Sequence, residues 1–282
     1  MKVSPAVQHR ITRFYYQMLS RIDTHAVMPF MNYGYADIDP GAPPLVLDEA
    51  DIVHRYWIQL YHHVASAVEL DGRQVLEVGC GRGGGTAYIA RYLRPKTLIG
   101  VDFADRAIRF CANQYLLDGV TFLGGEADTL PFAEHSFDSV INVESSHSYT
   151  SMEQFIGEVY RVLRPGGYFL YADFRRVVMI DRLRQQLTNG GFILLAERMI
   201  TPNVVRALDL DNDRKLDLIQ RHVPRLLTKS FMRFAAIRGT ELYEGFRTGQ
   251  LDYRSFVLQK PSSARPILVS GHNLIEQSNL SH

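Results

Sequence analysis

The sequence has little cysteine, little excess charge and no long apolar run, and each absence excludes a class of protein. Two cysteines, Cys80 and Cys111, cannot build a disulfide framework or a four-thiolate metal site, so we expect a reducing, cytoplasmic setting. A formal net charge of +1 over 282 residues gives no basic surface for nucleic acid. No apolar stretch approaches the ~18–20 residues that span a bilayer. The length suits one large domain, and a homodimer is possible.

Short apolar stretches alternate with helical segments in the middle of the chain, which predicts parallel strands joined by right-handed crossovers. Helices are expected around residues 85–93, 105–117 and 151–163. Strands are expected at residues 74–79, 97–103, 120–126, 137–144 and 167–174, with a sixth at 191–200 and a seventh, antiparallel at the sheet edge, at 251–260. We therefore predict an α/β fold with a Rossmann-like, doubly wound, seven-stranded sheet that is mostly parallel.

The regions outside this core are helical and rich in aromatic residues. Residues 1–70 are predicted to form a helical cap, residues 71–260 the core with a helical lid insertion at about 203–248, and residues 261–282 a mobile tail. The aromatic side chains of cap and insertion suit either a plain core or the roof of an apolar pocket. They are Phe14, Tyr15, Tyr16, Phe30, Tyr33 and Tyr35 in the cap, and Phe231, Phe234, Tyr243 and Phe246 in the insertion. For Tyr33, Phe234 and Tyr243 we predict substrate contacts.

A glycine turn follows the first expected strand, in the stretch VLEVGCGRGGGTAYIA at residues 75–90. Gly79, Gly81 and Gly84 match the dinucleotide pattern G-x-G-x-x-G, in which a helix N-terminus binds the pyrophosphate. Glu77 favours a ligand with an ammonium group instead, because a carboxylate at the strand end can accommodate a cation. Asp102, at the end of the next strand, can accept hydrogen bonds from ribose hydroxyls in both cases. The turn alone leaves both ligands open.

Later motifs favour one of the two ligands. From about Gln74 to Asp173 the chain resembles class I S-adenosylmethionine-dependent methyltransferases: VLEVGCGRGGG resembles their first motif, GVDF the second, EADTLPF the adenine-binding segment, and RVLRPGGYF the approach to the fifth strand. The resemblance implies S-adenosylmethionine as cofactor, with Glu126 on the adenine amino group and the Ala127 N–H on a ring nitrogen. Family members more often carry Asp at the position of Glu126. The full set of predicted cofactor-binding residues is Glu77, Gly79, Cys80, Gly81, Asp102, Phe103, Glu126, Ala127 and Asn142.

A narrower resemblance extends from about Asn32 to Lys260 and is carried by NYGY, IQLYHHVA, NVESSHSY and YFLYADFR. These segments resemble bacterial lipid and natural-product O-methyltransferases, in particular the phthiotriol and phenolphthiotriol dimycocerosate methyltransferases. Macrolide-sugar and indolocarbazole-sugar O-methyltransferases are more distant. The resemblance implies methylation of a hydroxyl on a bulky hydrophobic lipid or polyketide.

Methyl transfer to an alcohol needs a base, because the hydroxyl is a poor nucleophile until its proton is removed. His147 follows the fourth expected strand, and imidazole titrates near neutral pH. Asp173 ends the neighbouring strand and can orient the histidine, so we predict a base–orienter pair. Sugar O-methyltransferases of this type use a His and an Asp at matching positions. The alternative is a histidine that lines the pocket and a turn-forming carboxylate.

Other functions are weaker on the sequence but stay open. The same fold can serve C-methylation, cyclisation with the cofactor as scaffold, or ligand binding without chemistry. Residues 209–220 begin like a calcium loop, but Arg214 replaces the required Gly and Gln220 the bidentate Glu, so a solvated helix start is expected. His54, His62 and His63 lack a carboxylate or thiol partner at ligand spacing, and no metal is predicted.

Overall fold

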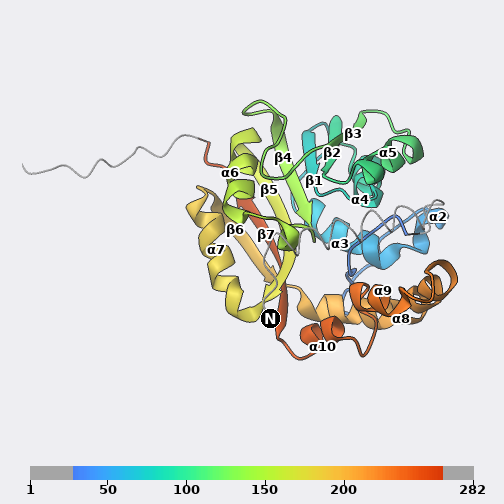
Figure 1. Cartoon of the computed structure of the whole chain (residues 1–282). Helices are drawn as coiled ribbons and strands as arrows, with labels where there is room; N and C mark the ends of the chain where they lie inside the picture. The colour runs from blue at the N-terminus through green and yellow to red at the C-terminus, as the bar shows by residue number, and fades with distance from the viewer. Residues whose placement is uncertain (1–27, 263–282) are drawn as a thin grey trace, which may run out of the picture.

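The computed structural model describes residues 28–262, in which one seven-stranded sheet lies between two layers of helices (Figure 1). The strand order is β3-β2-β1-β4-β5-β7-β6. The first five strands pair in parallel, and β7 is antiparallel to both neighbours. The strands are β1 (Gln74–Val78), β2 (Thr97–Asp102), β3 (Val120–Gly124), β4 (Phe137–Val143), β5 (Leu163–Arg176), β6 (Ile193–Met199) and β7 (Leu251–Gln259). The predicted doubly wound, mostly parallel sheet is confirmed.

One detail of the sheet differs from the prediction. The antiparallel strand β7 does not lie at the edge but one place in, between β5 and β6. Burial explains the order: Tyr253, Phe256 and Leu258 of β7 are at most 1% exposed, whereas Leu195 and Met199 of β6 are at least half exposed. The strand with apolar residues on both faces takes the interior position, and the more exposed strand forms the edge.

Alternate residues of each strand face the two helix layers, as the period of two requires. Val75 of β1 belongs to the buried cluster that contains α3 (Arg55–Ala65), α4 (Gly84–Tyr88) and the π-helical turn Ile89–Leu93. Leu76 belongs to the opposite cluster, with α6 (Met152–Val162) and α7 (Ile180–Asn189). The helix α5 (Asp105–Gln114) contacts β2 and β3, and the short α2 (Glu49–Ile52) precedes α3. Since α3 contacts β4 and β5, it is part of the core layer.

The helical insertion lies at the edge where the parallel strands end. It comprises α8 (Thr201–His222), α9 (Thr228–Phe234) and α10 (Glu241–Arg247), and it starts after β6 and returns at the beginning of β7. Residues 209–220, which resemble the start of a calcium loop, lie inside α8. Figure 1 shows α8–α10 (orange) gathered next to α2 and α3 (blue). None of the helices within residues 28–262 is long and apolar enough to cross a membrane.

The segment Met28–Tyr33, which we call the roof segment, packs on this insertion. Met28 and Met31 pack against a cluster containing Ile219 and Phe231. The Arg82 Nε–H donates to Met28 O (3.0 Å), and this contact ties the roof segment to the glycine turn. The aromatic residues Phe14, Tyr15 and Tyr16, and nearly all of the predicted tail, lie outside the described residues.

Candidate functional site

The glycines of the turn are required by their neighbours. A Cβ on Gly79, whose φ is +78°, would lie 2.4 Å from Ser145 Oγ, so only glycine lets the loop after β4 approach. A Cβ on Gly85 would lie 2.0 Å from Cζ of Tyr61 on α3. The turn therefore packs tightly between α3 and the β4 loop.

Five backbone N–H groups of the turn are already used within the protein. The five N–H groups concerned are those of Gly79 and Cys80, which donate to Val101 O, of Gly81, to Asp102 Oδ2, of Gly83, to Cys80 O, and of Gly84, to Pro29 O. A dinucleotide pyrophosphate needs such N–H groups free at the helix N-terminus. These five groups are therefore not available to a pyrophosphate, which disfavours a dinucleotide at this turn.

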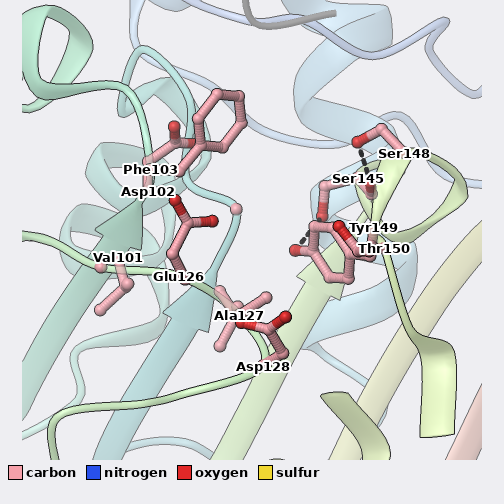
Figure 2. Close-up of a pocket in the computed structure, with 13 residues that line it drawn as sticks. Val101, Asp102, Phe103, Glu126, Ala127, Asp128, Ser145, Ser148, Tyr149 and Thr150 are labelled. Atoms are coloured by element: carbon pink, nitrogen blue, oxygen red, sulfur yellow. Dashed lines mark hydrogen bonds between the residues drawn. The ribbon is translucent and has the colours of Figure 1, made fainter. Parts of the chain in front are cut away.

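A pocket opens beside the turn, at the carboxyl ends of β1, β2 and β4. Three carboxylates line it, those of Asp102, Glu126 and Asp128, and among the described residues no Lys, Arg or His does. Figure 2 shows Asp102 and Glu126 on one side and Ser145 and Tyr149 on the other. This acidic lining opposes a phosphate-bearing ligand and favours a neutral or cationic one. The predicted residues Gly79, Phe103 and Ala127 line the same pocket.

Asp102 is held in place by two backbone donors. Gly81 N–H donates to Oδ2 and Ala104 N–H to Oδ1, each at 2.9 Å. Burial raises the pKa of this carboxyl, and the two hydrogen bonds counteract the rise. Its orientation into the pocket is thus fixed before any ligand binds.

Glu77, Asn142 and Cys80, which were also predicted to bind the cofactor, support the glycine turn through contacts inside the protein. Glu77 is fully buried, and its oxygens accept hydrogen bonds from the hydroxyls of Tyr61 and Thr86. Burial raises the pKa of Glu77 to about 7. Asn142 Nδ2 donates to Val78 O at 2.8 Å and thereby joins β4 to β1. The Cys80 side chain packs in a small cluster with Cys111 and Phe122, and burial raises the pKa of its thiol, so a nucleophilic role has no support.

His147 and Asp173 lie together at the same edge. His147 is in the short 3-10 turn Ser146–Ser148 after β4, and Asp173 is near the end of β5. His147 Nδ1 is 2.9 Å from Asp173 Oδ1, and the His147 backbone N–H donates to Oδ2 at 2.8 Å. Because Nδ1 then carries the proton, Nε2 is the basic atom. The imidazole is 25% exposed and the carboxylate is fully buried, so one ring edge remains accessible.

Asp173 is an anion stabilised by its surroundings. Burial acts to raise its pKa, but the positive charges of His147 and Arg175 and the hydrogen bonds of His147 and Ser146 outweigh burial and hold the pKa far below its ordinary value. Ser146 Oγ donates to Oδ2 at 2.7 Å, and Arg175 Nη1 lies 3.1 Å from the same oxygen. A carboxylate that stays ionised can hold an imidazolium beside it.

Aromatic rings connect His147 to an apolar chamber. The His147 ring centroid lies 4.6 Å from that of Phe174, which in turn is 5.6 Å from Tyr33 and 5.4 Å from Phe246. Beyond Tyr33, a largely apolar pocket opens between the roof segment, α3 and α8–α9. Its aromatic lining consists of Phe30, Tyr33, Trp57, Phe231 and Phe234.

The three residues predicted to contact the substrate thus lie in two different places. Tyr33 and Phe234 lie on the apolar chamber. Tyr243, on α10, is buried in the core, and its hydroxyl donates to Asp209 Oδ1 at 2.8 Å.

Comparison with known proteins places this geometry in a family. Residues 76–171 match a methyltransferase-domain family. The chain is 38% identical to a fatty-acid O-methyltransferase of Mycolicibacterium smegmatis, over 93% of both chains. This chain belongs to the S-adenosylmethionine-dependent methyltransferases. It is also 37% identical to a phthiotriol/phenolphthiotriol dimycocerosates methyltransferase of Mycobacterium tuberculosis, over 91% of this chain and 94% of the relative.

The fold of this methyltransferase also resembles solved structures. It superimposes on the [4+2]-cyclase SpnF with a TM-score of 0.68 and 19% sequence identity, covering 89% of this chain and 96% of the other. The expected family, fold and enzyme class are thereby confirmed.

His54, which precedes α3 as its N-cap, and His62 and His63 within the helix are accounted for by side-chain contacts or by burial. His62 Nδ1 lies 2.7 Å from Tyr88 OH, and His63 Nε2 lies 2.9 Å from Ser255 Oγ. Burial lowers the pKa of His54 to about 4. Within residues 28–262, no three His, Cys, Asp or Glu side chains are grouped so that they could hold a metal ion.

Sequence reasoning missed several residues of this methyltransferase site. Ser146 precedes His147 directly and Arg175 lies two residues after Asp173, so their positions could have marked them as partners of the pair. Tyr61 and Thr86, which bond Glu77, gave no local signal. Glu144, the first residue after β4, also escaped notice.

Proposed function

We propose that this chain is an O-methyltransferase that uses S-adenosylmethionine to methylate a hydroxyl of a bulky hydrophobic lipid or polyketide, with His147 as general base. The observation that carries the proposal is the buried Asp173 hydrogen-bonded to His147, with the imidazole beside Phe174 and the aromatic residues that lead to the chamber. Proximity supplies much of the acceleration of a displacement of this kind. The pair supplies the proton acceptor.

The donor residues fit S-adenosylmethionine. In this proposal, Asp102 accepts the ribose hydroxyl hydrogens, Glu126 and the Ala127 N–H bind adenine, and the Gly79–Gly81 turn shapes the pocket. The bound cofactor supplies an electrophilic methyl group. As the acceptor oxygen bonds to that methyl and the sulfur–methyl bond breaks, His147 Nε2 takes the hydroxyl proton and Asp173 balances the imidazolium. S-adenosylhomocysteine and the methyl ether are the products.

The His147–Asp173 pair favours an alcohol over a carboxylic acid as the methyl acceptor. A fatty-acid carboxylate is ionised at neutral pH and needs no base, whereas an aliphatic hydroxyl does. The two relatives differ in this respect, because one is named for fatty acids and the other for phthiotriols. The fully buried, ionised Asp173 supports the acceptor that requires proton removal.

The test is incubation with methyl-labelled S-adenosylmethionine and three acceptors: a long-chain secondary alcohol, the fatty acid of equal chain length, and glycerol. We expect label in the ether of the long-chain alcohol. Ester formation alone would identify the enzyme as a carboxyl methyltransferase, and turnover of glycerol alone would contradict the apolar chamber. Product mass and chemical shift separate O- from C-methylation. In a separate incubation with a polyketide, conversion of the polyketide without label transfer would indicate a cyclase.

A further inference from the structure

Glu144 is a buried carboxyl group at the centre of the site that the proposed chemistry does not use. It follows β4 directly, and its side chain is only 5% exposed. Its φ of +51° lies in the left-handed region, which costs free energy for a residue other than glycine. Such a backbone conformation persists only where the surrounding contacts fix it, so the placement of this carboxyl is specific.

One oxygen of Glu144 has two protein partners. Oε2 accepts the backbone N–H of Tyr33 at 2.9 Å and the hydroxyl of Tyr253 at 3.0 Å. These donors come from the roof segment and from β7, so the carboxyl joins parts of the chain that are far apart in sequence. Lys215 is buried nearby, where its ammonium donates to Tyr33 O at 3.2 Å.

The other oxygen is available. Among the described residues no donor bonds to Glu144 Oε1, and Glu144 lines a small pocket between the roof segment and the glycine turn. Gly79, Gly81 and Arg82, whose Nε–H donates to Met28 O, line the same pocket, and Gly79 also lines the acidic pocket assigned to adenosine. The two pockets thus meet at Gly79. A ligand that extends from the adenosine pocket across Gly79 reaches Glu144.

Glu77 does not offer the same contact. Both of its oxygens accept hydroxyl hydrogen bonds, from Tyr61 and Thr86, and it lines neither of the two pockets that meet at Gly79. The carboxyl with a spare acceptor at this end of the donor site is therefore Glu144.

We propose that Glu144 Oε1 accepts a hydrogen bond from the α-ammonium group of the methyl donor. The inference rests on the proposed function, since it assumes that S-adenosylmethionine binds across Gly79. Burial raises the pKa of Glu144 well above its ordinary value. A hydrogen bond from an ammonium group counteracts this rise, because it favours the ionised carboxylate, and so it contributes to donor affinity. The same carboxylate holds Tyr33 N–H, so the donor ammonium and the roof segment share one anchor.

The experiment compares two ligands by calorimetry: S-adenosylhomocysteine, and 5′-methylthioadenosine, which lacks the amino-acid part. The variant is Glu144→Gln. Its amide oxygen can keep the bonds to Tyr33 and Tyr253, while an NH2 group replaces the free acceptor. We expect affinity for S-adenosylhomocysteine to fall about 10- to 100-fold, with affinity for 5′-methylthioadenosine unchanged. The matched control is Glu77→Gln, which should leave the ratio of the two affinities unchanged.

A second experiment uses only the wild-type protein, so its result does not depend on how the variant folds. The wild-type protein is titrated with S-adenosylhomocysteine lacking only its α-amino group, which should bind more weakly than the parent compound. Equal binding of these two ligands, or an equal loss of both original ligands in Glu144→Gln, overturns the assignment to Glu144. If wild-type protein binds neither S-adenosylhomocysteine nor 5′-methylthioadenosine, the proposed function itself fails.

Discussion

The acidic pocket, which is the proposed donor pocket, and the apolar chamber, which is the proposed acceptor site, are built in different ways. The donor pocket takes its residues from the ends of consecutive strands, so that Gly79, Asp102 and Glu126 each follow a strand by at most two residues or end it. The apolar chamber combines the roof segment and α3 with α8 and α9, which lie more than a hundred residues further along the chain. One site is a property of the sheet, and the other is a property of long-range packing.

Because the two regions are built differently, we expect them to contribute different properties to the enzyme. Strand ends at one edge of a parallel sheet meet wherever the fold forms, so donor binding and the His147–Asp173 pair follow from the topology. The chamber depends on how the insertion packs on the roof segment, and it can change without disturbing the sheet. We therefore expect changes at the strand ends to affect chemistry and donor affinity, and changes in the chamber to affect the acceptor alone.

The largest expected effect is on the proposed catalytic base. His147→Ala should lower kcat on an alcohol acceptor by about 10²–10⁴-fold, the usual contribution of a general base, with donor affinity unchanged. Single-turnover kinetics and calorimetry with S-adenosylhomocysteine measure the two quantities. His222→Ala, at the exposed end of α8, is the control. Full turnover in His147→Ala would show that proximity alone accounts for the reaction.

The second effect tests the donor side. Asp102→Ala should weaken S-adenosylhomocysteine binding by about 1.5–3 kcal/mol, the loss of hydrogen bonds to a charged acceptor. Asp71→Ala changes an exposed carboxylate in the turn before β1, at the opposite end of that strand, and should have no effect. Tight binding of NADH by the wild-type protein, with no response to S-adenosylhomocysteine, would contradict the assignment of this pocket.

These two predictions use residues that the sequence could identify. The period-two and helical patterns predicted the sheet, and a parallel sheet brings its carboxyl ends together, so His147 and Asp173 could be paired although they lie 26 positions apart. Asp102 was predicted from its place at a strand end and Glu126 from the family resemblance, and both line one pocket. The antiparallel strand was misplaced by one position, because periodicity gives no information on which of two late strands pairs with β5.

The sequence could not show which carboxyl of the site has an oxygen to spare. Glu77 is the last but one residue of β1 and Glu144 directly follows β4, and only the three-dimensional contacts of Tyr61 and Thr86 distinguish the two carboxyls. Aromatic composition likewise could not separate Tyr33, which lies on the chamber, from Tyr243, which packs in the core. Both distinctions depend on side-chain packing between distant segments.

The third prediction concerns the chamber. Phe234→Ala should raise KM for a long-chain alcohol about 10-fold, because partial loss of a buried aromatic contact costs roughly 1–2 kcal/mol. The Kd for S-adenosylhomocysteine should not change. Leu226→Ala, at a side chain that is 98% exposed, is the matched control. An equal change in donor Kd and acceptor KM would show that the chamber and the donor pocket are not independent.

The last expected effect is on stability and not on activity: a pH dependence that comes from the buried carboxyl of Glu77. The pKa of Glu77 is raised by burial from its ordinary value of 4.5 to about 7 in the folded protein. Between these values the folded form holds a proton that the unfolded form releases, so the Glu77 contribution is full below pH 4.5 and is lost as pH rises toward 7. The loss is at most about 3 kcal/mol, which corresponds to several degrees in Tm.

The measurement is the difference in Tm between wild type and Glu77→Gln from pH 5 to 7, without ligand. A difference is needed because His54 and His63, whose pKa values are lowered to about 4, destabilise the fold as pH falls and therefore act in the opposite direction. In Glu77→Gln the amide can still bond the hydroxyls of Tyr61 and Thr86, but it does not titrate. We expect the Tm of the variant, relative to wild type, to rise with pH across this range. The surface substitution Glu134→Gln should show no such trend, and a constant difference for Glu77→Gln would mean that this buried carboxyl titrates as an ordinary glutamate.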